Sequence, residues 1–375
     1  MSRMIRAVPT LIVALWFAAA CSADPATSRT DADPVSPDVS PDITPDTSPD
    51  TKEVAVPETP STLTFEELLA DGPYEEITST TFTFVDPTRA TPAFKTYEGA
   101  PDRTLIVDVH VPTTADGPRP WIVHAHGFLS TRKDSPKLVG FLASHGYVVA
   151  AVEFPTTNRT APGGPNGLDA PQQPQDLRFV AQALLDENAA GSGSVLEGRL
   201  DPTRAIVTGI SLGGVSAVGA SMDPAADDPF SGVVSVAGVT CWADRGWFDT
   251  QEPLLVMHGD SDAIVPFDAN AQAAWDLAQT PKYLVTLHTG THTGFADATA
   301  ALFESLDHAD EIGCSALEGT FPEDNEAADA WDPTRTVGGD SCPLPCPDPE
   351  ALGVGMSPLR QVDLLLVTVR AFADG

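Results

Sequence analysis

The chain has 375 residues, of which 42% are hydrophobic, and it carries a formal net charge of −33. A chain of this length and apolar content can bury the core of one large domain or of two small ones. So much negative charge repels the phosphates of nucleic acids and of anionic membranes, and we expect neither as a direct partner.

The first 21 residues have the pattern of an export signal. Two arginines in residues 1–6 precede an apolar run over residues 7–20, which is too short for a committed transmembrane helix. Cys21 follows three alanines and resembles the lipidated cysteine of a bacterial lipoprotein signal. Lipidation would anchor the protein to a bacterial membrane, in the periplasm or at the cell surface. Because Ala18 stands where such signals often have leucine, secretion without an anchor is the alternative.

A proline-rich acidic segment follows over residues 22–60. Pro-Asp pairs recur every four residues between Pro37 and Asp50, and this composition provides no packed core. We therefore expect a disordered tether, stiffened by proline, that joins the signal to a folded domain over residues 61–375.

From residue 78 onward, strand-like and helix-like runs alternate. This alternation predicts an α/β fold with about eight mostly parallel strands and helices on both faces of the sheet. The last helix should begin at Pro358, with Ser357 as its N-cap. The expected strands cover 78–85, 104–111, 121–123, 147–152, 205–208, 233–236, 254–257 and 283–287, and the other expected helices cover 138–144, 176–185, 215–221 and 269–278.

Two connecting segments predict how open the molecule is. Residues 239–252 separate two expected strands and are too few for a helical lid, so we expect an open cleft and no large lid domain. Residues 306–356, called the excursion below, break the alternation. They are acidic, rich in glycine and proline, and come just before the last helix. The sequence assigns the excursion no function.

Four cysteines remain when Cys21 is assigned to the signal. An even number in an exported chain predicts two disulfides, and three pairings can be drawn. The sequence does not choose among them. A zinc site with four thiolates is the alternative, which the absence of a paired C-x-x-C motif disfavours. The four residues are Cys241, Cys314, Cys342 and Cys346.

One motif carries a chemical signature, the run Gly209-Ile210-Ser211-Leu212-Gly213 behind the apolar segment 205–208. A G-x-S-x-G motif between a strand and a helix places the serine on a sharp turn with its hydroxyl exposed, and the small flanking residues allow that turn. The N-terminus of the following helix directs N–H groups toward a developing oxyanion. Ser211 is therefore the candidate nucleophile.

A nucleophilic serine needs a histidine base and a carboxylate that orients the base. Asp262 follows the expected strand 254–257, and His292 follows the expected strand 283–287. All three side chains thus come from loops at the carboxyl ends of strands, which meet at one edge of a parallel sheet. Asp260 and His288 are the alternatives in the same two loops. We assign Asp260 to a turn or cap and His288 to the end of the strand.

Over about residues 62 to 375 the chain resembles the α/β-hydrolase superfamily, in which the three residues follow in the order Ser, Asp, His. Two motifs are similar to those of one branch of this superfamily. They are the stretch 258–266, His-Gly-Asp-Ser-Asp-Ala-Ile-Val-Pro, and the G-x-H turn that ends at His292. That branch holds platelet-activating-factor acetylhydrolases, chlorophyllase-like enzymes and bacterial polyester hydrolases of the cutinase type. The resemblance implies that Asp262 is the acid and His292 the base. Ile210, in place of an aromatic residue or histidine, and the excursion depart from this branch and leave the acyl preference open.

The same resemblance implies three further site residues. Phe128, after His126-Gly127, and Leu212, after the nucleophile, would supply two backbone N–H groups to an oxyanion. Trp242 stands where polyester hydrolases have a tryptophan that stacks on substrate. Packing in the interior is the alternative for Phe128 and Trp242.

The expected function is that of a serine hydrolase whose catalytic domain cleaves carboxylic esters through an acyl-enzyme, as a monomer acting on a small-molecule or polymeric ester. No cofactor and no metal are expected. His124 and His126 could place two imidazoles on one strand face, but no third ligand stands at a telling spacing. Two rival functions remain. One is a serine peptidase of the prolyl-oligopeptidase type, whose access-restricting domain has no room before residue 62. The other is a non-catalytic surface binding protein, which an intact triad disfavours.

Overall fold

The structure is a computed structural model that describes residues 64–227, 229–318, 330–339, 342–343, 345–346 and 352–375. The predicted signal, Cys21 and the tether lie outside these residues, as do parts of the excursion. None of the described helices is long and apolar enough to cross a lipid bilayer.

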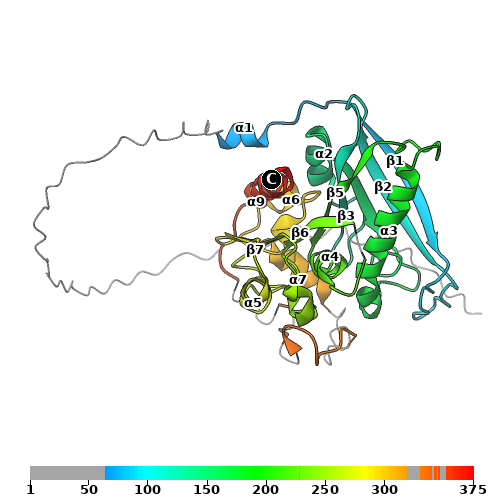
Figure 1. Cartoon of the computed structure of the whole chain (residues 1–375). Coiled ribbons are helices and arrows are strands. Elements are labelled where there is room, and N and C mark those ends of the chain that lie inside the picture. Colours follow the sequence, from blue (N-terminus) through cyan, green and yellow to red (C-terminus); the bar gives the residue numbers. More distant parts are fainter. Residues whose placement is uncertain (1–63, 228, 319–329, 340–341, 344, 347–351) are drawn as a thin grey trace, which may run out of the picture. The chain divides into compact units, whose positions relative to one another are not determined.

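An eight-stranded sheet forms the middle layer, in the order β1-β2-β4-β3-β5-β6-β7-β8 (Figure 1). Strands β1 and β2 are antiparallel to their neighbours in the sheet. The other six strands, β3 to β8, run parallel to one another. All eight strands lie where the sequence predicts them, and the α/β class is confirmed. They are β1 Ile77–Asp86, β2 Arg103–Pro112, β3 Arg119–Ala125, β4 Val148–Glu153, β5 Leu200–Ile210, β6 Phe230–Val236, β7 Leu254–Gly259 and β8 Lys282–Leu287.

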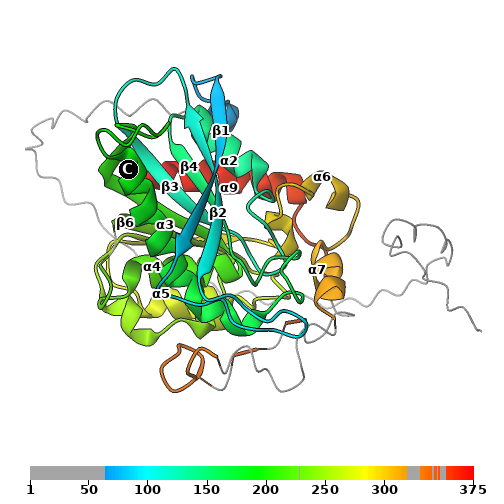
Figure 2. The same ribbon diagram turned by 90° about the vertical axis from the view of Figure 1, so that its right-hand side faces the viewer.

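Helices cover both faces of the sheet, as predicted (Figures 1 and 2). Helices α2 (Pro136–Ser144) and α9 (Pro358–Asp374) pack on one face, and α3 (Gln173–Asn188) and α4 (Leu212–Met222) pack on the other. Alternate residues of β3 divide between these two cores: Val123 faces α3 and α4, and Ile122 faces α2 and α9. Because both faces are buried, the central strands read as continuous apolar runs in the sequence.

The helix ends follow local rules, with one difference from the prediction. The hydroxyl of Ser357 accepts the amide hydrogen of Arg360 at 3.2 Å, which confirms the expected N-cap of α9. The expected helix 269–278 is instead a π turn, η4 (Asp268–Gln272), followed by a short α5 (Ala273–Leu277). Shorter helices lie elsewhere: α1 Phe65–Leu69, η1 Gly167–Gln172, η2 Thr240–Trp242, η3 Arg245–Asp249, η5 Thr293–Phe295, α6 Ala300–Phe303 and α7 Asp310–Leu317.

Two disulfides involve the described parts of the excursion: one ties it to the rest of the domain, and the other lies within it. Cys241, in η2 after β6, pairs with Cys342, and Cys314, in α7, pairs with Cys346. These bonds select one of the three pairings that the sequence left open and leave no thiolate among the four for zinc. Between β6 and β7 the structure has only the short turns η2 and η3, as the length of that segment predicts.

A buried arginine ties the edge of the sheet to the helical layer. Arg103, at the start of β2, has no exposed surface. Its guanidinium donates two hydrogen bonds to the carboxylate of Asp176 on α3, at 2.6 and 2.7 Å, and one to Asp169 on η1 at 2.8 Å. Both carboxylates are buried, so removing the arginine would leave two negative charges in the interior, of which Asp176 also pairs with Arg89.

Replacing Arg103 by leucine should therefore lower the free energy of unfolding by about 3–5 kcal/mol, because breaking one side of a buried ion pair leaves uncompensated charge. Urea denaturation measures this loss. The matched control is Arg370→Leu, which breaks a partly exposed pair with Asp374 on α9 and should change stability by less than about 1 kcal/mol. Equal effects of the two substitutions would contradict the role assigned to Arg103.

Candidate active site

Ser211 lies on a strained turn between β5 and α4. Its backbone has φ 58° and ψ −122°, a conformation that residues with a side chain rarely adopt. Its amide donates to the carbonyl of Val236 at 2.9 Å, so the neighbouring strand β6 holds the turn in place. This is the sharp strand-to-helix turn that the G-x-S-x-G motif predicts.

The glycines of the motif let three segments approach closely. A Cβ at Gly209 would clash with the carbonyl oxygen of Gly213, and a Cβ at Gly213 would clash with the carbonyl oxygen of Ala125 in β3. A Cβ at Gly127, in the loop after β3, would lie 3.1 Å from Cβ of Ser211. Side chains at these positions would force β5, α4 and the β3 loop apart.

Two hydrogen bonds of 2.8 Å join Ser211 to His292 and His292 to Asp262. The Nε2 atom of His292 lies 2.8 Å from Oγ of Ser211, and its Nδ1 atom lies 2.8 Å from Oδ2 of Asp262. A carboxylate only accepts hydrogen bonds, so Nδ1 carries the proton. In the neutral imidazole, Nε2 is then an acceptor for the serine hydroxyl.

The carboxylate of Asp262 is fully buried and surrounded by donors. Its Oδ1 accepts the amide hydrogens of Ile264 and Val265 at 3.0 and 2.6 Å, and its Oδ2 accepts from Nδ1 of His292. Nε2 of His258, which lies 2.8 Å from the carbonyl oxygen of Val265, is 3.1 Å from the same Oδ2. Burial by itself would raise the pKa of Asp262, but the two histidines hold the pKa well below its ordinary range. Asp262 is therefore charged throughout the neutral range.

The same contacts act on the imidazole of His292. Burial lowers the pKa of His292, whereas the charge of Asp262, its hydrogen bond and the charge of Asp310 raise it, and the net shift is upward from 6.5. The imidazolium that forms when His292 takes a proton is stabilised by the carboxylate beside it.

The two alternative residues pair with each other at the surface. Nδ1 of His288 lies 2.8 Å from Oδ2 of Asp260, and the histidine side chain is 93% exposed, whereas that of His292 is 11% exposed. Asp260 also accepts the amide hydrogen of Thr289 at 2.7 Å, which fits the turn role expected for it.

The two residues expected to bind an oxyanion lie around the same cavity as Ser211. Phe128 is in the loop after β3, and Leu212 is the first residue of α4, where helix amides have no partner within the helix. The geometry of their N–H groups toward a bound oxyanion stays a prediction.

The cavity beside Ser211 has a volume of about 250 Å³ and a mostly apolar lining. Phe128 and Trp242 contribute aromatic walls. Part of the remaining wall comes from the excursion, to which the sequence assigns no function. Its lining residues are Gly313, Ala316 and Leu317 of α7, together with Cys342, Pro343 and Pro345.

The paired imidazoles of β3 are engaged in hydrogen bonds within the protein. His124 contacts the hydroxyls of Thr208 and Ser135 at 2.9 and 3.0 Å, and burial lowers its pKa to about 4. His126 contacts the carbonyl of its neighbour Gly127 at 2.7 Å. Among the described residues, no group of three histidine, cysteine or acidic side chains is placed to hold a metal ion.

The hydrogen-bonded set Ser211, His292 and Asp262 is called the relay below. Two residues around it were not predicted from the sequence. His258 stands four residues before Asp262 and contacts it, and this spacing within the motif is a signal that could have pointed to it. Asp310 accepts the amide hydrogen of His292 at 3.1 Å. It is one of many acids in the excursion, and no local pattern distinguishes it.

A serine, histidine and aspartate joined at the carboxyl edge of this sheet are typical of α/β-hydrolases, and comparisons with known proteins agree with that class. A family model described as PETase, PET hydrolase-like, matches residues 106–305, more than half of the chain. The chain belongs to this PET hydrolase-like family. The match ends before α7, so the excursion and α9 lie beyond it.

Curated relatives match over part of their length. The chain is 30% identical over 188 residues to a bis(hydroxyethyl) terephthalate hydrolase from Streptomyces coelicolor, covering 49% of this chain and 54% of the relative. It is 27% identical over 169 residues to cutinase est1 from Thermobifida alba, covering 44% and 51%. The chain thus spans about half the length of these relatives.

A solved structure supports the fold alone. The ferulic acid esterase from Streptomyces cinnamoneus superposes with a TM-score of 0.51 at 20% sequence identity, covering 78% of this chain and 98% of that chain.

Replacing Gly209 by alanine should lower the free energy of unfolding by about 1–3 kcal/mol, because the new methyl group meets the backbone of α4. The control is Gly140→Ala in α2, where a Cβ meets nothing within 4 Å. That change should raise stability by about 1 kcal/mol, because alanine is the better helix former. Thermal or urea unfolding of both variants measures the two effects, and shifts of the same sign would contradict the steric account of the turn.

Proposed function

We propose that this chain is a serine hydrolase that cleaves carboxylic esters through an acyl-enzyme intermediate. The observation that carries the proposal is the pair of 2.8 Å hydrogen bonds that join Ser211, His292 and Asp262. Ser211 is the nucleophile, His292 the general base and then the general acid, and Asp262 the carboxylate that orients the imidazole.

In the first half-reaction, His292 takes the hydroxyl proton of Ser211 while Oγ forms a bond to the ester carbonyl carbon. The carbonyl electron pair moves onto its oxygen, and the N–H groups of Phe128 and Leu212 stabilise that oxyanion. When the carbonyl re-forms, the alkoxide leaves and takes the proton from His292. In the second half-reaction, a water molecule repeats these steps, releases the carboxylic acid and returns the proton to Ser211.

The lining of the cavity indicates the part of the substrate that it holds. Phe128 and Trp242 offer aromatic surface to an apolar acyl or aryl group, and we assign Trp242 a stacking role. The names of the relatives, a terephthalate ester hydrolase and a cutinase, support an ester of an aromatic or fatty acid, either small or within a polymer. The net charge of −33 disfavours esters of strongly anionic molecules.

The segments before the domain complete the proposal. Residues 1–21 act as an export signal of the lipoprotein type with Cys21 as the lipidated residue, and residues 22–60 act as a tether for the catalytic domain of residues 61–375. The protein would then act as a monomer outside the cytoplasm, anchored to a bacterial membrane by its lipid or secreted.

Replacing Ser211 by alanine should lower kcat for a p-nitrophenyl ester by about a millionfold, because the nucleophile is lost while the cavity is kept. The variant should also fail to label with a fluorophosphonate probe. The wild-type protein should turn over the ester in preference to the matching anilide. Preference for the anilide would favour a peptidase, and absence of labelling in the wild type would favour a binding protein.

The activity should depend on the protonation of His292, since only the neutral imidazole can take the serine proton. Because the pKa of His292 is raised from 6.5, kcat/KM should fall on the acid side with a midpoint above pH 6.5. Asp262→Asn should move that midpoint to lower pH and lower kcat by about 10⁴-fold, since the carboxylate is lost.

Asp260→Asn is the matched control for this pH profile, because Asp260 pairs with the exposed His288 in the same loop region. It should leave both kcat and the midpoint unchanged. If Asp260→Asn had the larger effect, the assignment of the acid would be wrong.

A further inference from the structure

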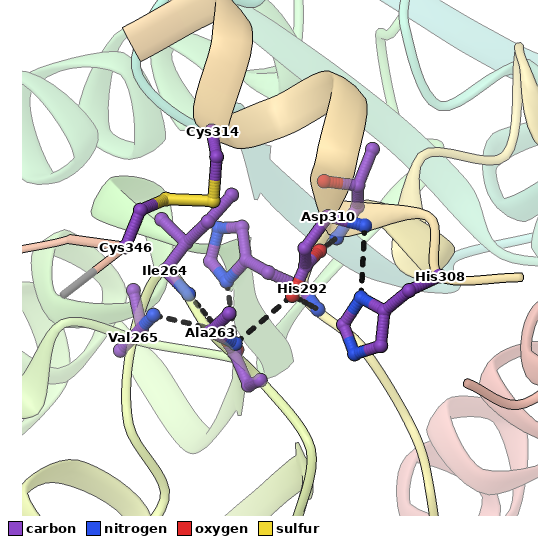
Figure 3. Close-up of a disulfide and its surroundings, with 10 residues drawn as sticks. Ala263, Ile264, Val265, His292, His308, Asp310, Cys314 and Cys346 are labelled. Carbon is purple, nitrogen blue, oxygen red and sulfur yellow. Dashed lines mark hydrogen bonds and ion pairs between the residues drawn. A yellow bond between two sulfur atoms is a disulfide. The ribbon is translucent and has the colours of Figure 1, made fainter. Parts of the chain in front are cut away.

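Asp310 is a buried acid that no step of the proposed reaction uses. It is the first residue of α7, in the excursion, and has no exposed surface. Its carboxylate accepts three backbone hydrogen bonds. Oδ2 accepts from Ala263 at 2.9 Å and from His292 at 3.1 Å (Figure 3), and Oδ1 accepts from Thr293 at 2.6 Å. Hydrogen bonds to a charged acceptor are stronger than those between neutral groups.

These three donors belong to the two loops that carry the acid and the base. Ala263 follows Asp262 directly, and Thr293 follows His292 directly. One carboxylate therefore holds the backbone of both loops, at positions next to the two side chains whose separation determines the Asp262–His292 hydrogen bond.

The rest of α7 keeps Asp310 in place. Cys314, one turn further along the helix, is bonded to Cys346, whose amide donates to the carbonyl of Ala263 at 2.8 Å (Figure 3). Ala263 is thus bonded to the excursion through both its N–H and its C=O. At Gly313 the helix lies so close that a Cβ would meet the side-chain atoms Oγ1 of Thr293 and Cδ1 of Ile264, one residue from each of the two loops.

We propose that Asp310 is a positioning residue, which fixes the acid loop and the histidine loop at the separation that the relay requires. The proposal rests on the proposed esterase function. It assigns a catalytic purpose to α7, which lies beyond the residues that the family model matches.

The charge of Asp310 has a second effect, which separates positioning at this site from a merely structural role. The charged groups around His292 are Asp262 at Nδ1 and Asp310 at its backbone, with His258 behind Asp262. Asp310 adds to the upward shift in the pKa of His292, so removing its charge lowers that pKa.

Asp310→Asn tests the proposal in the full-length protein. The amide keeps the size of the side chain but has one acceptor oxygen in place of two, so the backbone donors of the two loops lose part of their partner. We expect kcat for a p-nitrophenyl ester and the rate of fluorophosphonate labelling of Ser211 to fall by about 100-fold, the effect of a misplacement near 1 Å. We also expect the acid midpoint of kcat/KM to move to lower pH. Amide hydrogen exchange should speed up in peptides that cover residues 260–266 and 290–295.

Gly313→Ala is the second variant, because its methyl group presses on the side chains of Thr293 and Ile264, one in each loop, without changing any charge. It should slow labelling of Ser211 and leave the acid midpoint where it is in the wild type. Asp86→Asn is the control for loss of a buried carboxylate: Asp86 is 4% exposed and accepts the amide hydrogen of Thr88 at 2.9 Å, on the far edge strand β1. It should change neither kcat nor the midpoint.

The outcomes separate the two proposals. If Asp310→Asn is folded and keeps the wild-type kcat and midpoint while Ser211→Ala is inactive, the role of Asp310 is wrong and the esterase function stands. If Asp310→Asn does not fold, an unchanged labelling rate in Gly313→Ala overturns the role. If Ser211→Ala and the wild type are equally inactive and unlabelled, the function itself is wrong, and faster exchange in the two loop peptides would still show that Asp310 holds them.

Discussion

The arrangement of the candidate site depends on how one buried carboxylate, that of Asp262, obtains its donors. A charge in the interior is unfavourable unless hydrogen bonds replace the water it has lost. Asp262 accepts two amide hydrogens from its own loop and one imidazole N–H from the loop after β8, and the imidazole of His258 in β7 lies 3.1 Å from it. Because these donors come from separate elements, satisfying one side chain also fixes two loops relative to each other. The same contact orients His292 and leaves its Nε2 facing Ser211.

The serine is held by steric constraint rather than by charge. A positive φ at Ser211 is unfavourable by itself, and it persists because β5 and α4 are buried in a core that extends over both faces of the sheet. Gly209, Gly213 and Gly127 allow the surrounding backbone to close around the turn. A rigidly held serine hydroxyl thus meets an imidazole whose orientation is set by Asp262.

The excursion supplies a part of the cavity wall that the sequence did not predict. The segment between β6 and β7 is as short as expected, but α7 and the residues near Cys342 supply part of the wall, so the cleft is bounded from a different place in the chain. The same disulfide-bonded segment lines the cavity and, through Asp310, accepts backbone hydrogen bonds from both loops. A change in that segment should therefore affect both the fit of the ester and the alignment of the relay.

Local patterns in the sequence determined the eight strands, the cap of α9, the turn at Ser211 and the even set of cysteines, because periodicity, capping and small residues act over a few positions. Those patterns also limited the acid and the base to two residues each. Only the tertiary structure decided that Asp262 meets His292 while Asp260 meets His288, which cysteines pair, and that Asp310 lies behind both loops. Such contacts join residues far apart in the chain, and burial, which distinguishes one aspartate from its neighbour two positions away, arises only when the elements pack. The signal, the tether, the oxyanion N–H groups and the stacking role of Trp242 stay predictions from the sequence.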